Sequence, residues 1–386
     1  MSAHYPAVKD DCVELLAGLV AIDSVNPDLV PGAKGEGEIA AFVADWLGRR
    51  GLEVHVEDSG RMDRPNVVAV ARGTGGGRSL MLNAHMDTVG VAGMQGPFQP
   101  AIRDGRLYGR GAMDTKAALA AFMVALAEAK ELPLRGDAIL TAVVDEEYAS
   151  AGTEAVVKKW KADAAVVGEP TGLQIVTAHK GFVWFEIETH GVAAHGSRPD
   201  IGVDAIAKMG RVLVAIGELA NRLLKSRAHA ILGPGSIHAS LIQGGQELSS
   251  YPASCRLGIE RRTIPNESID AIENDLRLRL DRIAREDPGF KATLRRLFTR
   301  EPYEARGDAP IVELAKCHVE AVTKEAPVLS GMSAWMDSAL IAAAGIPAVI
   351  LGPYGMGLHG ETEWVDLESV RACSAVALGM IEDFCR

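Results

Sequence analysis

The order of apolar strands and helical segments constrains this chain more than any other feature of its sequence. In the first 178 residues, short apolar runs typical of buried strands alternate with segments that have the apolar spacing of helices. The expected strands are residues 66–72, 80–84, 139–144 and 164–167, and the expected helices are residues 10–21, 36–50, 115–129 and 153–160. This alternation predicts an α/β fold with a mixed, largely parallel sheet and helices on both of its faces.

A glycine-rich run, Gly-Thr-Gly-Gly-Gly at residues 73–77, joins the first two of these strands. It lacks the full G-x-G-x-x-G pattern and connects strand to strand rather than strand to helix, which argues against a phosphate-binding loop. We therefore expect a flexible β-hairpin at this point.

The pattern changes at about His179. The next elements follow the order β-α-β-β-α-β, with strands at 181–189, 236–243, 253–262 and 290–298 and helices at 203–225 and 268–285. This order is typical of a small ferredoxin-like domain, in which two helices back an antiparallel sheet. The α/β pattern then resumes, with helices at 311–323, 335–344 and 367–384 and a strand at 348–351. We expect one α/β domain built from residues 1–178 and 301–386, interrupted by an inserted domain of residues 179–300.

Composition excludes several classes of partner. The net charge of -11 argues against a nucleic acid or an anionic membrane surface. The N-terminus lacks the basic start and apolar core of a signal peptide, and no apolar run approaches the roughly 20 residues of a membrane helix. The five cysteines are scattered and have no Cys-x-x-Cys spacing, as in cytoplasmic proteins with reduced thiols. We expect a cytoplasmic protein without a disulfide framework.

Acidic and imidazole side chains follow the ends of the apolar strands or lie in the loops after them. They are His85 with Asp87, Asp114, the pair Glu146 and Glu147, Glu169, and His359. Each has an ordinary structural interpretation when taken singly: Asp114 could cap the helix at 115–129, the glutamates could end solvated strands, and His359 could be a loop residue. Because ligands of open α/β sheets bind outside the carboxyl ends of the strands, their joint occurrence predicts one site.

Two histidines and three or four carboxylates suit a pair of divalent cations with nitrogen and oxygen ligands. Zinc is the first candidate, and cobalt or manganese could substitute for it. Adjacent Glu146 and Glu147 make chemical sense if one binds metal while the other takes a proton from a metal-bound water. Asp87 can accept the second ring N–H of His85 and fix its tautomer.

Five sequence motifs resemble those of the M20 metallopeptidase and deacylase family, which includes acetylornithine deacetylase, succinyl-diaminopimelate desuccinylase and glutamate carboxypeptidase. They are Ala-His-Met-Asp, Gly-Arg-Gly-Ala-Met-Asp-Thr-Lys, Asp-Glu-Glu, Gly-Glu-Pro and Leu-His-Gly-Glu-Thr-Glu-Trp-Val, and the resemblance covers essentially the whole chain. It implies a catalytic α/β domain with an inserted lid or dimerisation domain, which agrees with the change of pattern at His179.

The resemblance also implies roles for the strand-end residues. One zinc ion would be held by His85, Asp114 and Glu169. The second would be held by Asp114, Glu147 and His359, with Asp114 bridging the two ions. Asp87 would orient His85, and Glu146 would be the general base.

The inserted domain adds three candidates through the same resemblance. His195, in Gly-Val-Ala-Ala-His-Gly-Ser-Arg-Pro, would stabilise the oxyanion, often in the site of a partner subunit of a homodimer. Arg262 would bind a substrate carboxylate, whereas Arg261 on the other face of the strand would be solvated. Ser249 stands where the family commonly has Asn, and the loop at 330–338 has Met336 in place of a hydroxyl residue. Both departures concern substrate choice. The remaining histidines at 179, 190, 229 and 238 are expected to be structural or exposed.

The resulting hypothesis is a two-metal amidohydrolase that cleaves a small N-acyl amino acid, or a dipeptide-like amide, with a free carboxylate. A metal-activated water would attack the amide with Glu146 as general base. Two alternatives stay open: a carboxypeptidase or dipeptidase on the same scaffold, and a catalytically inactive relative that only binds. The sequence names neither the acyl group nor the amino acid.

Overall fold

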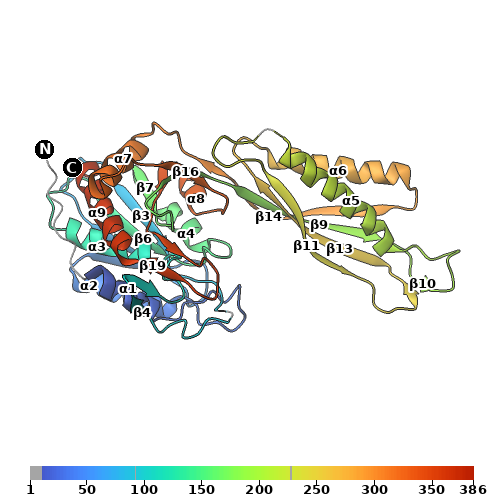
Figure 1. The fold of residues 1–386 in the computed structure, drawn as a ribbon, viewed down its shortest axis with the longest axis horizontal. Helices are drawn as coiled ribbons and strands as arrows, with labels where there is room; N and C mark the ends of the chain where they lie inside the picture. The colour runs from blue at the N-terminus through green and yellow to red at the C-terminus, as the bar shows by residue number, and fades with distance from the viewer. Residues whose placement is uncertain (1–10, 92, 227) are drawn as a thin grey trace. The chain divides into compact units, whose positions relative to one another are not determined.

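The computed structural model describes residues 11–91, 93–226 and 228–386. It contains two compact units, which are described separately (Figure 1). Unit 1 consists of Met1–Thr177, Ala305–Ser330 and Met336–Arg386, and unit 2 of Ala178–Glu304 and Gly331–Trp335. Asp10, where the first helix was expected to begin, and the N-terminal residues used to argue against a signal peptide lie outside the described ranges.

Unit 1 is built on a mixed sheet. Its strands lie in the order β1 (Glu53–Glu57), β2 (Asn66–Ala71), β6 (Ala138–Val143), β3 (Leu80–His85), β7 (Ala164–Val167), β17 (Ala348–Ile350) and β8 (Ile175–His179). A short strand, β16 (Leu329–Met332), also pairs with β8, and the division between the units falls within these two strands. The four central strands β6, β3, β7 and β17 are parallel, so their carboxyl ends meet at one edge of the sheet. The predicted α/β class with a mixed, largely parallel sheet is confirmed.

The predicted hairpin at residues 73–77 is wrong. Strand β6 lies between β2 and β3, antiparallel to the first and parallel to the second. The glycine-rich loop packs instead against the chain that enters β6: the N–H of Gly75 donates to the carbonyl of Arg135 at 2.8 Å. A Cβ atom on Gly73 would lie 2.4 Å from the carbonyl oxygen of Gly136, so this close approach of two backbones requires glycine.

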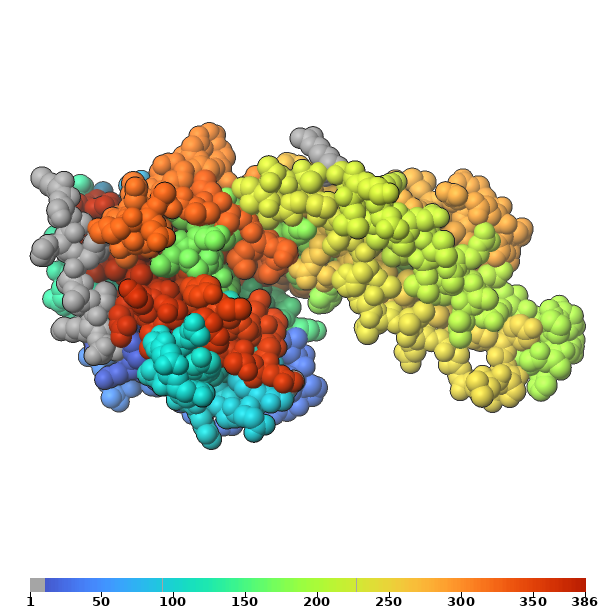
Figure 2. Space-filling model, viewed as in Figure 1, coloured from blue at the N-terminus to red at the C-terminus, as the bar shows by residue number. Residues whose placement is uncertain are grey.

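Helices cover both faces of this sheet. The larger core lies under α1 (Asp11–Val20), α2 (Gly37–Arg49), α3 (Lys116–Ala129), α7 (Pro310–Thr323) and α9 (Leu367–Phe384), and α4 (Ala151–Lys159) and α8 (Ser338–Ala343) pack on the opposite face. Helix α3 is buried on nearly all sides, because small alanines let it fit between the sheet and α9. Figure 2 shows the red C-terminal segment packed beside the blue N-terminal segment, so both ends of the chain build unit 1.

A second, small sheet in unit 1 has the order β18 (Gly355–Met356), β19 (Trp364–Asp366), β5 (Arg106–Tyr108) and β4 (Ala101–Arg103). Trp364 pairs with Tyr108 across β19 and β5. The pairing places the loop between β18 and β19 beside the loop that follows β5.

Unit 2 contains an antiparallel sheet with the order β11 (Ser236–Gly244), β13 (Ser254–Thr263), β9 (Gly181–His190) and β14 (Lys291–Arg300). Helices α5 (Ala205–Leu224) and α6 (Ile269–Glu286) cover one face of it (Figure 1). In β9 and β13 buried and half-buried residues alternate, as in sheets with one covered face. A separate ladder joins β10 (Ala194–His195) to β12 (Ser250–Tyr251).

Residues Gly331–Trp335 also belong to unit 2, which the sequence did not indicate. The indole N–H of Trp335 donates to the carbonyl of Glu301 at 3.0 Å, and its ring meets that of His179 edge-on. Within the described ranges, no helix combines the length and apolar character needed to cross a membrane.

Gly168, at the end of β7, offers a test of this packing. A Cβ atom there would lie 2.8 Å from the Cβ of Ala118 and 2.8 Å from the ring of Phe122 in α3. We expect Gly168→Ala to lower the free energy of unfolding by about 1–3 kcal/mol, the usual effect of overpacking. Urea unfolding of the metal-free protein measures it.

The matched control is Gly48→Ala in α2, where no atom lies within 4 Å of the added Cβ. That change should leave stability equal or raise it by up to ~1 kcal/mol, because alanine favours a helix more than glycine does. Equal effects from the two substitutions would contradict the close packing of β7 against α3.

Candidate metal centre

The strand-end residues of unit 1 come together at the carboxyl edge of the parallel strands. His85 is the last residue of β3, Glu146 and Glu147 follow β6, and Glu169 follows β7. Asp114 lies in the loop before α3, and His359 lies between β18 and β19. Each group is presented by a turn that leaves the rigid sheet or by a loop packed next to it.

These residues form two overlapping groups of possible metal ligands. The first is His85, Asp114 and Glu169, the second is Asp114, Glu147 and His359, and within each group the ligand atoms lie within 4.8 Å of one another. The Oδ1 atom of Asp114 lies 3.1 Å from Nε2 of His85, and its Oδ2 atom lies 3.4 Å from Nε2 of His359. The two oxygens of one carboxylate thus face different histidines.

The ordinary interpretations of these residues do not hold in the structure. Thr115, not Asp114, occupies the N-cap position of α3. Glu169 is only 6% exposed, so it is not a solvated turn residue. His359 is half exposed, but its Nε2 atom lies 3.3 Å from Oε2 of Glu147.

Electrostatics indicates that this cluster suits cations. Burial raises the pKa of Glu147 to about 7, and burial among other carboxylates raises the pKa values of Glu146 and Glu169 well above their usual range. The carboxylates of Asp114 and Glu147 raise the pKa of His359 to about 10. Buried negative charge is costly unless it is paired. A set of two imidazoles and three carboxylates with this need for positive charge fits divalent metal ions.

Asp87 is buried beneath this cluster. Nδ1 of His85 lies 3.0 Å from the backbone carbonyl of Asp87 and 3.4 Å from its carboxylate. The two carboxylate oxygens also accept the backbone N–H groups of Glu146 and Glu147, each at 3.1 Å. Asp87 therefore contacts three residues of the site, whereas the sequence suggested only His85.

Comparisons with known proteins identify the family. The model of peptidase family M20/M25/M40 matches residues 81–383. The chain belongs to this family. An acetylornithine deacetylase from Myxococcus xanthus is 31% identical over 392 aligned residues, which cover 100% of this chain and 99% of that protein. The chain is thus a metal-dependent hydrolase of the deacetylase or peptidase type that acts on amide bonds.

Two solved structures share the fold of this M20 chain. Aminopeptidase PepT from Bacillus cereus ATCC 10987 superposes with a TM-score of 0.80 at 21% identity, covering 99% of this chain and 100% of that one. The YXEP protein of Bacillus subtilis, named a dinuclear metal binding peptidase from the M20 family, superposes with a TM-score of 0.74 at 16% identity. That match covers 97% of each chain.

Glu363 holds the loop that presents Asp114, a role that the sequence did not indicate. This buried carboxylate accepts the backbone N–H groups of Gly111 at 3.1 Å, Met113 at 2.8 Å and Asp114 at 3.1 Å. It also pairs with the buried guanidinium of Arg110 at 2.7 Å. Glu363 lies four residues after His359, so it joins the loop of that histidine to the loop that presents Asp114. In the sequence, the one signal for Glu363 is its place in the motif Leu-His-Gly-Glu-Thr-Glu-Trp-Val.

Asp337 was another position without an assigned role. It is 1% exposed, its carboxylate accepts the hydroxyl of Thr153 in α4, and burial raises its pKa to about 6. Met336, which replaces the family's hydroxyl residue, is buried as well. This loop therefore anchors the start of α8 against α4.

The three candidates of unit 2 lie at two different places within that unit. His195, on β10, is exposed and contacts the hydroxyl of Ser197 at 2.8 Å. Ser249 lies next to it, since its carbonyl accepts the N–H of Gly196 at 2.7 Å. Arg262 is near the far end of β13, eight residues beyond Ser254, or about 26 Å at 3.3 Å per residue.

The two neighbouring arginines differ, but not as predicted. Arg261 is buried rather than solvated: its guanidinium pairs with Glu267 and contacts the carbonyl of Arg262. Arg262 is half-buried and donates from Nε to Glu260 at 2.8 Å. Arg261 is buried because it lies on the face of β13 that α5 and α6 cover, in line with Leu257 and Ile259.

Glu363→Gln tests the support of Asp114. The amide replaces one acceptor oxygen by a donor that faces backbone N–H groups, and it leaves Arg110 without its anionic partner. We expect zinc affinity, measured by chelator competition on the metal-free protein, to fall about 10–100-fold, as when other supporting groups of metal ligands are removed.

Glu361→Gln is the matched control, because Glu361 is exposed in the same loop. Its zinc affinity should equal that of the parent. Equal affinity in both variants would show that Glu363 does not position the ligand.

Proposed function

We propose that this M20 chain is a two-zinc hydrolase that removes the acyl group of an N-acyl amino acid. The observation that carries the proposal is the Asp114 carboxylate, whose two oxygens face the two histidines of two overlapping ligand groups. His85, Asp114 and Glu169 would hold one ion, and Asp114, Glu147 and His359 the other, with Co²⁺ or Mn²⁺ as possible substitutes. The dinuclear metal binding peptidase of Bacillus subtilis supports the number of ions. Bound cations would polarise the scissile carbonyl and acidify water.

Glu146 is the proposed general base. Among the described residues, no hydrogen bond reaches its carboxylate, and burial raises its pKa well above the usual range. A general base needs such a free carboxylate within reach of the attacking water. Glu146 takes the proton of the attacking water on a carboxylate oxygen and delivers it to the nitrogen of the leaving amine. Asp87 holds the backbone on which this carboxylate is presented.

Arg262 is the proposed binding group for the substrate carboxylate. The only side-chain hydrogen bond that Arg262 makes to a described residue uses Nε, so both terminal nitrogens can bind a carboxylate in bidentate fashion. The ring of Phe182 lies 5.2 Å from its guanidinium and limits its movement. Ser249, in the loop beside His195, is proposed to contact the substrate from the other end of the unit.

We assign unit 2 as a lid and dimerisation domain. Arg262 lies about 26 Å along β13 from Ser254, and Ser254 begins the strand just after the β10–β12 ladder that carries His195, so one small substrate is too short to touch both residues in the same chain. Both roles hold only if the oxyanion-binding histidine comes from a second copy of the chain. Unit 2 offers an edge for that copy. Strand β11 pairs with β13 on one side only, and its residues Leu241 and Ile242 are exposed.

Helix α5 extends this surface. Its residues Ile206, Leu213 and Val214 are exposed, and Ile206 contacts the end of β11 near Gly244. Gly210 and Gly217 have open space around them, which allows a second helix to approach closely. A homodimer through β11 and α5 is therefore the proposed assembly.

The second candidate is a peptidase that releases an amino acid from a dipeptide or a longer peptide. The fold shared with aminopeptidase PepT favours it, because the same centre can cleave either amide. The acetylornithine deacetylase relative, which aligns over the whole chain, favours the deacylase. An inactive binding protein is disfavoured, because all five proposed ligands and Glu146 are present in one cluster.

We also propose a cytoplasmic location. All five cysteines lie in the described ranges and are free thiols, and four of them are buried. Reduced thiols of this kind are typical of proteins in reducing compartments.

Glu146→Gln tests the proposed chemistry. It should keep the metal content and lower kcat by about 10²–10⁴-fold, the usual range for a general base. The adjacent variant Glu147→Gln should lower the metal content instead, because Glu147 is a proposed ligand. Both are measured by elemental analysis and by hydrolysis of N-acetyl amino acids, N-succinyl amino acids and dipeptides.

The same panel decides between deacylase and peptidase for the parent protein. The exposed variant Glu131→Gln should match the parent throughout. Parent-like turnover of Glu146→Gln on every substrate would rule out Glu146 as the base.

A mixing experiment tests the exchange of His195 between subunits. His195→Ala and Glu146→Gln should each be nearly inactive alone. Dimers reassembled from an equal mixture should recover about a quarter of the parent activity, because half of them are hybrids with one complete site of two. Activity of the mixture no higher than that of the separate variants contradicts the exchange.

Leu241→Asp on β11 should convert the dimer of the parent protein to a monomer, as measured by light scattering. Added to both His195→Ala and Glu146→Gln, it should also abolish the activity that their mixture recovers. Leu278→Asp on α6, an exposed leucine of the same unit, is the control and should leave the dimer intact. A parent protein that is monomeric would reject the proposed assembly.

A further inference from the structure

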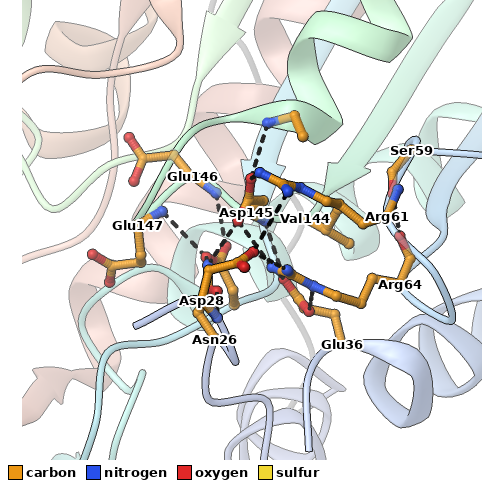
Figure 3. A network of polar contacts seen from close by, with 12 residues as sticks. Asn26, Asp28, Glu36, Ser59, Arg61, Arg64, Val144, Asp145, Glu146 and Glu147 are labelled. Atoms are coloured by element: carbon orange, nitrogen blue, oxygen red, sulfur yellow. Dashed lines mark hydrogen bonds and ion pairs between the residues drawn. The ribbon is translucent and has the colours of Figure 1, made fainter. Parts of the chain in front are cut away.

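A buried polar network lies behind the turn that carries Glu146 and Glu147 (Figure 3). Figure 3 shows the two carboxylates pointing away from this network, while the backbone nitrogens of both residues point into it. The network joins the loop of Asn26 and Asp28, the start of α2 at Glu36, the segment of Arg61 and Arg64, and the turn at Asp145. None of these residues belongs to the proposed ligand set.

Asn26 lies at the point where the network meets the turn. It is fully buried, and its side-chain amide donates to Oδ2 of Asp87 at 2.8 Å and to Oδ1 of Asp145 at 3.1 Å. Its side-chain oxygen accepts the N–H of Asp28 at 2.9 Å. Both protons of one amide thus link two carboxylates.

Each of these carboxylates holds the turn. Asp87 accepts the N–H groups of Glu146 and Glu147, so two hydrogen bonds in series connect Asn26 to the backbone of the proposed base. Asp145 is the residue before Glu146 and has a φ of 67°, in the left-handed region that residues with a side chain rarely adopt. A backbone of this kind persists only where its surroundings fix it.

Two arginines supply that fixation. Arg64 reaches Oδ1 of Asp145 at 3.0 Å, and Arg61 reaches Oδ2 at 3.0 Å. Arg64 is 6% exposed and also binds Glu36 at 2.8 Å and Asp28 at 2.7 Å. Its planar guanidinium therefore ties three carboxylates from separate segments into one rigid unit.

We propose that Asn26 and Arg64 are positioning residues of the hydrolytic reaction, which hold the 145–147 turn so that Glu146 reaches the attacking water and Glu147 reaches the metal. The inference rests on the proposed function of these two glutamates. A displacement of about 1 Å in a reacting group can cost about 10²-fold in rate, so the stiffness of the turn bears directly on kcat. Because Asn26 and Arg64 act on the turn and not on the substrate, KM should change little.

Three variants test the proposal on the full-length protein. Asn26→Ser keeps one donor, Asn26→Asp removes both donors and adds a negative charge beside two carboxylates, and Arg64→Lys keeps the charge but loses the planar fork. With metal restored, we expect kcat to fall about tenfold for Asn26→Ser and about 10–100-fold for the other two, with KM within about threefold of the parent. Chelator competition on the metal-free variants should show zinc binding weakened about 10–100-fold, because Glu147 shares the turn.

The chain offers matched controls. Arg72, at the other end of β2, also binds two carboxylates, Glu53 and Asp137, but is exposed and distant from the turn. Asn83 is a buried asparagine whose amide donates to the hydroxyls of Thr141 and Thr153. Arg72→Lys and Asn83→Ser should keep kcat within about threefold, even where melting temperature falls.

Parent-like kcat and zinc affinity in folded Asn26→Asp and Arg64→Lys, with only a lower melting temperature, would overturn the proposal. Hydrogen exchange of the parent protein gives a measurement that needs no variant. The amides of Glu146 and Glu147 should exchange far more slowly than amides of exposed loops, and rapid exchange would reject their fixation by Asp87.

The turnover of Glu146→Gln separates the positioning role of Asn26 and Arg64 from the proposed function of Glu146. If Glu146→Gln loses turnover while the Asn26 and Arg64 variants do not, only the positioning role is wrong. If Glu146→Gln keeps turnover, the general base is wrong, and zinc affinity and hydrogen exchange still decide whether the turn is held as proposed.

Discussion

The candidate site of unit 1 depends on one buried carboxylate, that of Asp114, which lies between the imidazoles of His85 and His359. Burial raises the pKa of Asp114, but the hydrogen bonds and charges of His359 and His85 together lower that pKa below its usual range. An ionised group in this position costs free energy unless each oxygen is satisfied. The parallel strands satisfy it by delivering His85 from β3, while the loop between β18 and β19 delivers His359 from the other end of the chain. The two histidines that face Asp114 thus come from segments 274 residues apart in the sequence.

The same physical solution recurs around this centre: a buried carboxylate accepts backbone N–H groups and fixes the loop that bears a reactive side chain. Glu363 does so for the loop of Asp114, and Asp87 does so for the turn of Glu146 and Glu147. Each of these buried carboxylates has a partner of its own: Glu363 pairs with the guanidinium of Arg110, and Asp87 accepts the side-chain amide of Asn26. The side chains of Asp114, Glu146 and Glu147 therefore take no part in fixing their own backbone, because Glu363 and Asp87 accept its N–H groups.

In unit 2, the features that bear on function are the edge strands of its sheet and the places of its candidate residues. Its sheet ends in two edge strands, β11 and β14, and β11 carries the exposed apolar residues Leu241 and Ile242; Arg262 lies near the end of β13, whereas His195 and Ser249 lie by the ladder before its start. Both are explained if two copies join their sheets and each supplies one histidine to the other, which is the assembly proposed above.

The sequence by itself determined the fold class, the β-α-β-β-α-β insertion and the family, because apolar periodicity and short motifs are local properties. It also singled out His85, Asp114, Glu146, Glu147, Glu169 and His359, since ends of parallel strands meet at one edge. Only the tertiary structure decided that β6 separates β2 from β3, that Arg261 is buried, and that Asn26, Arg64 and Glu363 hydrogen-bond to the segments that carry the site. Strand order and hydrogen bonds between distant segments depend on how the whole chain packs, and no local pattern encodes them.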